Sequence, residues 1–219
     1  MIENITNIEL SNEKFRILFE LSPLGMAMLE QETGKFLEVN QSLLNSLNYS
    51  KEEFLSLSFY DITPNEYEEQ EKQQIKDLES TGKFGPNEKE YIKKDGTRYP
   101  IIISGFSFTD SNNKKVVWGI IEDITEKKQY EIIYNDNKNL LEYIAIENSL
   151  QKVLDKIVNL AEKRNPEITC SILLLDETKQ HLLTGSAPSL PKFYNDAVNG
   201  VKIGEKVGSC GSAAYKFKF

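Results

Sequence analysis

A two-residue turn, Asp95-Gly96, lies between two strand-like segments and constrains the fold more than any other feature of the chain. Both residues tolerate a positive φ, and such a pair between strand-like segments is the strongest short-range signal of a β-hairpin. Residues 88–94 and 97–108 are therefore expected to be antiparallel neighbours. Such a sheet needs a covered face, so the remaining elements must supply helices to pack on it.

Three further segments complete the expected sheet. Residues 25–29 and 35–39 are predicted strands joined by a turn at Glu32-Thr33-Gly34, and residues 115–123 form the last strand. An amphipathic helix over residues 14–21 precedes them. Five strands with helices between the second and third predict an α+β unit, in which one face of an antiparallel sheet is covered and a cavity can lie between the layers.

The helices between the second and third strands are predicted from N-capping residues at their first turns. Asn40 is a suitable N-cap, and Ser50 with Glu53 forms a capping box. Thr63 is followed by Pro and, at the third position, by Glu, which predicts a helix over residues 64–79 with Thr63 as its cap. The many charged residues of that helix predict a solvated face, with Ile75 and Leu78 turned inward.

Four short motifs, in this order, carry a resemblance to a known family. They are Val39-Asn40, residues 48–53, Lys94-Asp95-Gly96 and Asp123-Ile124-Thr125. On these motifs residues 12–125 resemble a PAS domain. The resemblance implies the PAS fold, a five-stranded antiparallel sheet with helices on one face, and a sensory or interaction module. It also implies that Asp123, Ile124 and Thr125 relay signals from the sheet to the helix that follows.

A ligand pocket is expected between sheet and helices. The candidate residues are Met28, Asn40, Leu44, Tyr91, Tyr99, Phe106 and Trp118. The alternative is that the aromatic side chains only fill the core and that Asn40 is only a helix cap.

The first 169 residues lack the cysteine and the histidine that two classes of cofactor-binding domain need. Flavin photosensors of the LOV type, which resemble PAS domains, need a cysteine beside the flavin, and residues 1–169 contain none. Haem-binding relatives use a histidine, and the single His181 lies outside this unit. We therefore expect no tightly held cofactor and no metal, which leaves a non-covalent flavin or a small metabolite as the ligands to test.

A helix is expected to follow the sheet, with residues 126–137 as a linker. Its apolar seam follows 3-4-3-4 spacing and consists of Tyr130, Ile133, Asn137, Leu140 and Ile144. This spacing predicts a parallel coiled-coil homodimer in which Asn137 sets the register. A monomeric amphipathic helix is the alternative, because the pattern fails at Glu147.

Residues 138–219 resemble the first part of a GAF domain, an α/β unit found in bacterial sensor histidine kinases and diguanylate cyclases. The motifs are residues 171–176, 187–191 and 207–215. The resemblance covers about half of such a domain, so a truncated GAF unit and an output domain outside this chain are expected.

Charge and cysteine content exclude several classes of protein. The net charge of −8, with 26 basic residues dispersed among 34 acidic ones, argues against a nucleic-acid surface. No apolar run approaches the length of a membrane span, so a cytoplasmic protein is expected. Cys170 and Cys210 are too few for a disulfide scaffold and lack metal-ligand spacing.

The sequence therefore predicts a non-catalytic sensory input unit of a bacterial signal-transduction protein, since no nucleotide-binding or cyclase motif occurs in it. It would relay binding of a small molecule or partner to a dimeric helix. Two alternatives stay open: a ligand-free dimerisation module, and a thiol redox switch at Cys210, which sits near a predicted helix N-terminus.

Overall fold

The computed structural model describes residues 2–217 and the side chains of residues 12–217, and it separates into two compact units that meet between Tyr130 and Glu131. The helices of the first unit are α1 (Ile2–Leu21), α2 (Gln41–Leu47), α3 (Lys51–Leu55), α4 (Phe59–Ile62) and α5 (Glu68–Thr81), with a 3-10 turn at Asn65–Tyr67. Its strands are β1 (Gly25–Glu30), β2 (Phe36–Val39), β3 (Lys83–Ile92), β4 (Arg98–Thr109) and β5 (Lys115–Asp123).

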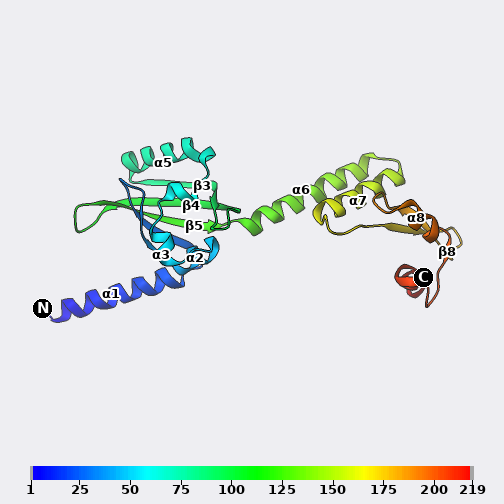
Figure 1. Ribbon diagram of the computed structural model, residues 1–219, viewed down its shortest axis with the longest axis horizontal. Coiled ribbons are helices and arrows are strands. Elements are labelled where there is room, and N and C mark those ends of the chain that lie inside the picture. Colours follow the sequence, from blue (N-terminus) through cyan, green and yellow to red (C-terminus); the bar gives the residue numbers. More distant parts are fainter. Residues whose placement is uncertain (1, 218–219) are drawn as a thin grey trace. The chain divides into compact units, whose positions relative to one another are not determined.

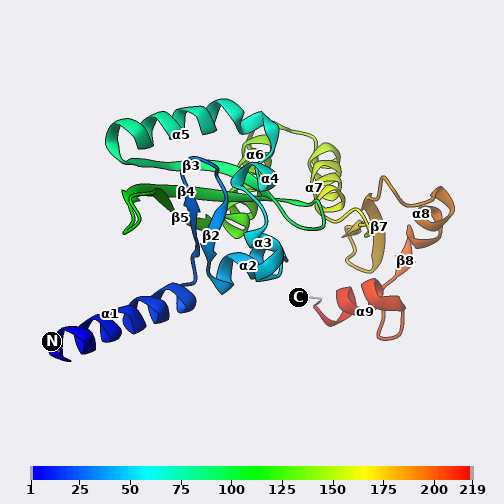
Figure 2. The same cartoon turned by 60° about the vertical axis from the view of Figure 1, so that its left-hand side comes forward.

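The five strands form one sheet in the order β2-β1-β5-β4-β3, and every neighbouring pair is antiparallel. The predicted α+β class and five-stranded antiparallel sheet are confirmed. At the β3–β4 turn Gly96 has a φ of 82°, and the Asp95 carboxylate accepts a hydrogen bond of 2.9 Å from the Thr97 N–H. Figure 2 shows α5 following the course of β3 and β4.

The two faces of the sheet are covered by different helices (Figure 1). Successive side chains of a strand point to opposite faces. In β5, Val117 and Ile121 therefore face the side on which α5 lies, while Trp118 faces α1. The rings of Phe15 and Phe19 meet the Trp118 ring edge-on, with centroids 5.8 Å and 5.3 Å away. The space below α5 is thus closed by β5 and its neighbours.

The short helices are fixed by the caps that the sequence predicts. The Asn40 side chain accepts from the Leu43 N–H and begins α2. The Ser50 hydroxyl and the Glu53 carboxylate form both hydrogen bonds of a capping box at the start of α3. The core beneath these helices includes Phe54, which is fully buried.

Thr63 does not cap the helix predicted over residues 64–79. Its hydroxyl donates a 2.8 Å hydrogen bond back to the Phe59 carbonyl and so closes α4. The chain then makes the 3-10 turn at Asn65–Tyr67, and α5 begins only at Glu68. The predicted start was wrong because the hydroxyl was already used by the preceding helix.

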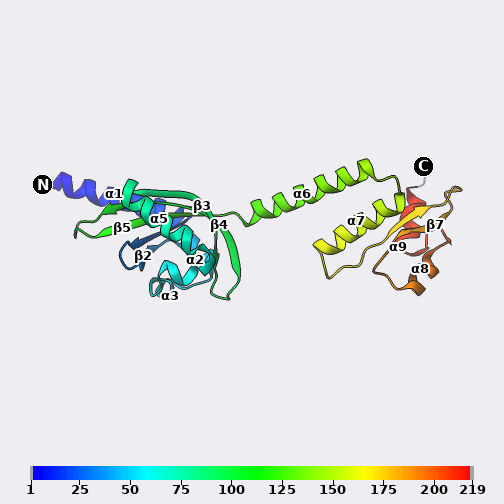
Figure 3. The same cartoon turned by 90° about the horizontal axis from the view of Figure 1, so that it is seen from above.

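The second unit contains the rest of the chain. Its elements are the larger part of α6 (Thr125–Ile146), then α7 (Leu150–Arg164), β6 (Ile172–Leu175), β7 (His181–Ser186), α8 (Lys192–Val198), β8 (Val201–Lys202) and α9 (Gly208–Lys216). The three strands form an antiparallel sheet in the order β6-β7-β8. Figure 3 shows α7 lying beside α6. β6 begins only at Ile172, and the preceding Cys170 N–H donates a 2.9 Å hydrogen bond to Glu162 of α7 rather than to a neighbouring strand. Across residues 2–217, no helix combines the length and the apolar character of a membrane span.

Candidate functional site

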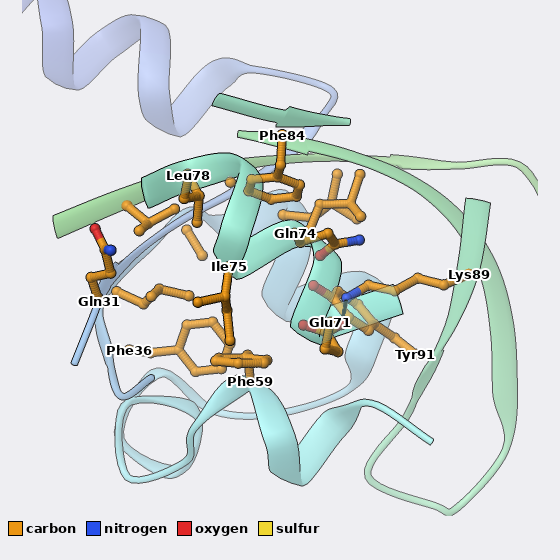
Figure 4. Close-up of a pocket in the computed structure, with 16 residues that line it drawn as sticks. Gln31, Phe36, Phe59, Glu71, Gln74, Ile75, Leu78, Phe84, Lys89 and Tyr91 are labelled. Carbon is orange, nitrogen blue, oxygen red and sulfur yellow. Dashed lines mark hydrogen bonds and ion pairs between the residues drawn. The ribbon is translucent and has the colours of Figure 1, made fainter. Parts of the chain in front are cut away.

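A cavity of about 60 Å³ lies between α5 and the sheet. Its apolar lining comes from every strand of the sheet and from α4 and α5: Ala27, Leu29, Phe36, Phe59, Ile75, Leu78, Phe84, Ile103, Val117, Gly119 and Ile121. Its polar lining is Gln31, Glu71, Gln74, Lys89 and Tyr91. Figure 4 shows the polar groups of α5 and β3 gathered at one end, with Phe36 and Phe59 beside Ile75.

One face of α5 supplies four of the lining residues. Glu71, Gln74, Ile75 and Leu78 are spaced by three and four residues, so they lie on the same side of the helix. The inward direction of Ile75 and Leu78 is as predicted. A carboxylate and an amide therefore share the inner face of a helix whose outer face is charged.

A buried ion pair joins α5 to β3. Lys89 Nζ donates a hydrogen bond to Glu71 Oε1, and the two side chains are only 2% and 9% exposed. Lys89 Nζ also lies 5.1 Å from the centroid of the Tyr91 ring, within cation–π range. Burial lowers the pKa of the Lys89 ammonium, while the neighbouring Glu71 carboxylate acts in the opposite direction.

Tyr91 contributes a hydroxyl that stays protonated. Burial, and next the negative charge of Glu71, raise the pKa of the Tyr91 phenol well above its ordinary value. The hydroxyl is therefore a hydrogen-bond donor or acceptor, never a phenolate, at neutral pH.

Two polar atoms of the lining have no hydrogen-bond partner among the described residues. They are Gln74 Nε2 and Gln31 Oε1, and both are shielded from solvent. A buried amide group without a partner costs about 1–3 kcal/mol, so such groups usually bind a water or a ligand. Gln74 is 4% exposed overall and lies three residues from Glu71.

Apart from Asn40, the pocket candidates from the sequence divide into three groups. Tyr91 lines the cavity, whereas Leu44 and Tyr99 belong to the packed core and do not line it. Met28 and Phe106 flank Trp118 on the neighbouring strands, so all three occupy the opposite face of the sheet.

Asn40 is a structural residue, as the cap alternative proposed. Its Oδ1 accepts from the Met26 N–H at 2.9 Å and from the Leu43 N–H at 3.2 Å. Its Nδ2 donates to the carbonyls of Phe19 at 3.0 Å and Leu24 at 2.9 Å. With all four hydrogen bonds made inside the protein, no donor or acceptor is left for a ligand.

Sequence reasoning missed Glu71, Gln74 and Lys89. The charged composition of residues 64–79 was interpreted as a solvated helix. Two signals could have identified these residues. Glu71 and Gln74 share a helix face with Ile75 and Leu78. Lys89 is two residues from Tyr91 in a strand, so both side chains point to the same face of the sheet.

The exit from the sheet is short and buried. Ile124 alone separates β5 from α6, is 2% exposed, and its N–H donates a 3.1 Å hydrogen bond to the Pro100 carbonyl of β4. The Asp123 carboxylate accepts a 2.8 Å hydrogen bond from the N–H of Thr125, the first residue of α6. Lys128, one turn later, pairs with Glu88 of β3 at 2.6 Å.

The predicted seam of α6 meets α7 of the same chain in part. Asn137 Oδ1 accepts from the Arg164 guanidinium at 3.1 Å, and the Ile133 carbonyl does so at 3.4 Å. Leu140 is half-buried, while Tyr130 and Ile144 are exposed.

The second unit contains the single histidine and both cysteines. His181 Nδ1 lies 3.0 Å from Asp176 Oδ2 on a strand. Cys170 is partly buried, and Cys210 is exposed on α9. No group of three His, Cys, Asp or Glu residues arranged to hold a metal ion occurs in the described part of the chain.

Comparisons with known proteins match the first unit most directly. A family model described as PAS domain matches residues 23–126. The methyl sulfide methyltransferase-associated sensor of Methanosarcina acetivorans is 30% identical over 175 residues, which cover 78% of this chain and 18% of that protein. The probable diguanylate cyclase DgcE of Escherichia coli is 32% identical over 146 residues, covering 65% of this chain and 13% of that protein. The chain thus spans less than a fifth of either relative.

Solved structures of domains from signalling proteins are similar to part of this chain. A PAS domain of an HTR-like protein from Haloarcula marismortui is 24% identical, with a TM-score of 0.47, and covers 57% of this chain and all of that one. A domain of a sensor histidine kinase/response regulator from Geobacter sulfurreducens is 18% identical, with a TM-score of 0.46, and covers 53% of this chain and 96% of that one.

Proposed function

We propose, from the premise that residues 23–126 are a PAS domain with relatives in signal-transduction proteins, that this chain is a non-catalytic sensory input unit. A small molecule enters the cavity below α5, and the resulting shift of the sheet passes through Asp123, Ile124 and Thr125 into α6. The output domain belongs to a longer signalling protein, such as a histidine kinase or a diguanylate cyclase.

The observation that carries this proposal is the burial of Ile124 between β5 and α6. With its side chain in the core and its N–H bonded to Pro100, the junction has no loop that could absorb a movement of the sheet. An element packed in two alternative ways transmits a shift, whereas a flexible hinge dissipates it. The proposal therefore places the relay at this junction.

β3 supports the same proposal from the cavity side. Lys89 faces the cavity, while the adjacent Glu88 points to the other face and pairs with Lys128 of α6. A displacement of β3 at Lys89 thus moves a side chain that holds the first turn of α6.

We further infer that the PAS domain spans residues 12–125, that residues 126–137 are a signalling linker, and that residues 138–219 are the first part of a GAF domain. The sequence motifs of the second unit support the last assignment. The match to the Methanosarcina sensor also covers 78% of the chain, which is more than residues 23–126.

A metabolite screen tests the relay. Binding at about 100 times the dissociation constant should raise the melting temperature by roughly 5 °C and slow hydrogen exchange in residues 126–130. Two glycines inserted between Asp123 and Ile124 should preserve the thermal shift and abolish the effect on exchange.

The same insertion in the exposed turn at Asn112-Asn113 is the control and should leave both effects intact. Unchanged coupling across the inserted glycines would contradict the relay. A screen in which no metabolite shifts the melting temperature would instead favour the ligand-free dimerisation module.

The exposed apolar residues of α6 support the second part of the proposal, a homodimer. Tyr134 and Leu141 are 70% and 67% exposed and lie seven residues apart. With Asn137 and Ile144 they follow heptad spacing, so in this seam Tyr134 and Leu141 take the places that Ile133 and Leu140 have in the predicted one.

Light scattering tests the homodimer. At tens of micromolar, on the order of usual assay concentrations, we expect a dimer that Leu141→Glu converts to a monomer, because a carboxylate is not tolerated in an apolar seam. Asn135→Glu, on the same helix and outside the seam, should leave the dimer intact. A monomeric wild-type protein would refute this part.

A further inference from the structure

We propose that the cavity below α5 binds a short monocarboxylate of two or three carbons, whose carboxylate takes the place of Glu71 on Lys89. This inference rests on the proposed function, because it specifies the chemical class of the ligand for the same cavity. It is carried by the unused hydrogen-bond donors, the size of the cavity and the position of Glu71.

Hydrogen-bond donors without a partner lie at the polar end of the cavity. An ammonium group has three N–H donors, and Glu71 Oε1 is the one acceptor that Lys89 Nζ reaches among the described residues. Gln74 Nε2 has two further donors and no partner within the same set of residues. Glu71 and Gln74 lie one turn apart on α5, so these donors converge (Figure 4).

A carboxylate satisfies such a group of donors better than a neutral molecule does. It offers two oxygens and no competing donor, and its hydrogen bonds to an ammonium are about twice as strong as neutral ones. An alcohol or an amide would bring its own N–H or O–H to a region already rich in donors.

The cavity volume limits the ligand to a few atoms. One water needs about 10–15 Å³ of such space. The 60 Å³ present therefore accommodates about four or five non-hydrogen atoms, the size of acetate or propionate. The methyl end would contact the apolar lining of the cavity.

Glu71 has a place to go when the ligand arrives. It lines the cavity and also a groove between α5 and residues 60–65, which is open to solvent and includes Glu68 and Lys72. Ile75 lines both spaces too, so Glu71 and Ile75 together separate the cavity from the outside. Rotation of Glu71 outward would avoid two carboxylates on one ammonium and would open an access route.

Such an exchange would also remove a hydrogen bond between α5 and β3 and leave the one of 3.1 Å from Gln70 Nε2 to the Glu88 carbonyl. The hydrogen bond between Glu71 and Lys89 joins the two elements. The ligand would bind Lys89 in place of Glu71, and its one polar contact with α5 would be to Gln74. The ligand therefore alters the strand that holds Lys128 through Glu88.

Calorimetric titration of the whole chain with sodium propionate, at matched ionic strength, tests the inference. Propionate should bind the wild type, and propionamide, its neutral counterpart, should bind at least about tenfold more weakly, because a charge-assisted hydrogen bond is lost. This comparison needs no variant. Equal binding of the two molecules, or no heat from propionate, would overturn the proposal.

Two variants should act in opposite directions. Lys89→Met removes the anchoring cation and should weaken propionate binding at least about tenfold. Glu71→Gln removes the competing carboxylate and should strengthen it by about the same factor. Lys94→Met removes a lysine from the exposed pair with Glu53 and is the matched control, expected to bind as the wild type does. Weaker binding by Glu71→Gln would show that propionate does not replace Glu71.

The proposed function can survive failure of this inference. If a neutral metabolite raises the melting temperature and slows exchange in residues 126–130 while propionate does neither, the relay holds and the carboxylate class is wrong. If propionate binds but exchange in residues 126–130 is unchanged, the ligand class holds and the relay is wrong.

Discussion

Asn40→Ala is expected to lower the free energy of unfolding by about 3–5 kcal/mol, because it removes a helix cap and leaves several buried backbone groups without partners. The Asn40 side chain is fully buried and joins three elements. Its Oδ1 accepts from the Met26 N–H of β1 and the Leu43 N–H of α2. Its Nδ2 donates to the carbonyl of Phe19 in α1 and to that of Leu24 just before β1. Urea unfolding of the variant measures the loss.

Ser50→Ala is the matched control for Asn40. Ser50 caps α3 through one side-chain hydrogen bond to the Glu53 N–H and is exposed. Its loss should cost about 1 kcal/mol, the ordinary value of an N-cap. Similar costs at the two positions would show that Asn40 is only a cap and that its bonds to Phe19 and Leu24 add nothing.

Glu71→Leu is expected to cost about 3–5 kcal/mol, because it leaves the ammonium of Lys89 buried without a carboxylate. Lys89→Met should cost less, because Glu71 also lines the groove between α5 and residues 60–65 and can reach water there. The double variant should regain most of the stability, because apolar side chains of similar size often replace a buried ion pair without loss. A double-mutant cycle in urea gives the coupling energy.

The exposed pair of Glu53 and Lys94 provides the control cycle. Its charged groups lie 2.6 Å apart, closer than in an ordinary salt bridge, yet the side chains are about half exposed. Water solvates both partners after either substitution, so a much smaller coupling is expected. Additive effects of Glu71→Leu and Lys89→Met would mean that burial, rather than the ion pair, dominates at the cavity.

Much of the first unit could be predicted from local patterns. The turn at Asp95-Gly96, the cap at Asn40 and the capping box at Ser50 depend on residues within a few positions of one another, and all three occur as expected. The start of α5 was missed because the Thr63 hydroxyl can bond either the following helix or the preceding one. It bonds the Phe59 carbonyl of α4, and this depends on how α4 packs.

The candidate site was much less predictable. Six of the seven expected pocket residues lie outside the cavity, since aromatic and apolar residues look alike in sequence whether they face a cavity, a packed core or the far side of a sheet. Met28, Phe106 and Trp118 lie in strands whose side chains alternate between the two faces of the sheet, and nothing local tells which face carries the cavity. The side of the sheet that α5 covers decides which set lines the cavity.

The amino-acid sequence by itself determined the strands, their antiparallel hairpin and the direct passage from Asp123 into a helix, because turns, caps and alternation are set by neighbouring residues. Only the tertiary structure decided that Glu71 meets Lys89, 18 positions away, and that Gln74 faces the same cavity without a partner. An ion pair of this kind depends on how a helix is rotated against a strand. That rotation is fixed by the packing of many apolar side chains at once, and no local pattern records it.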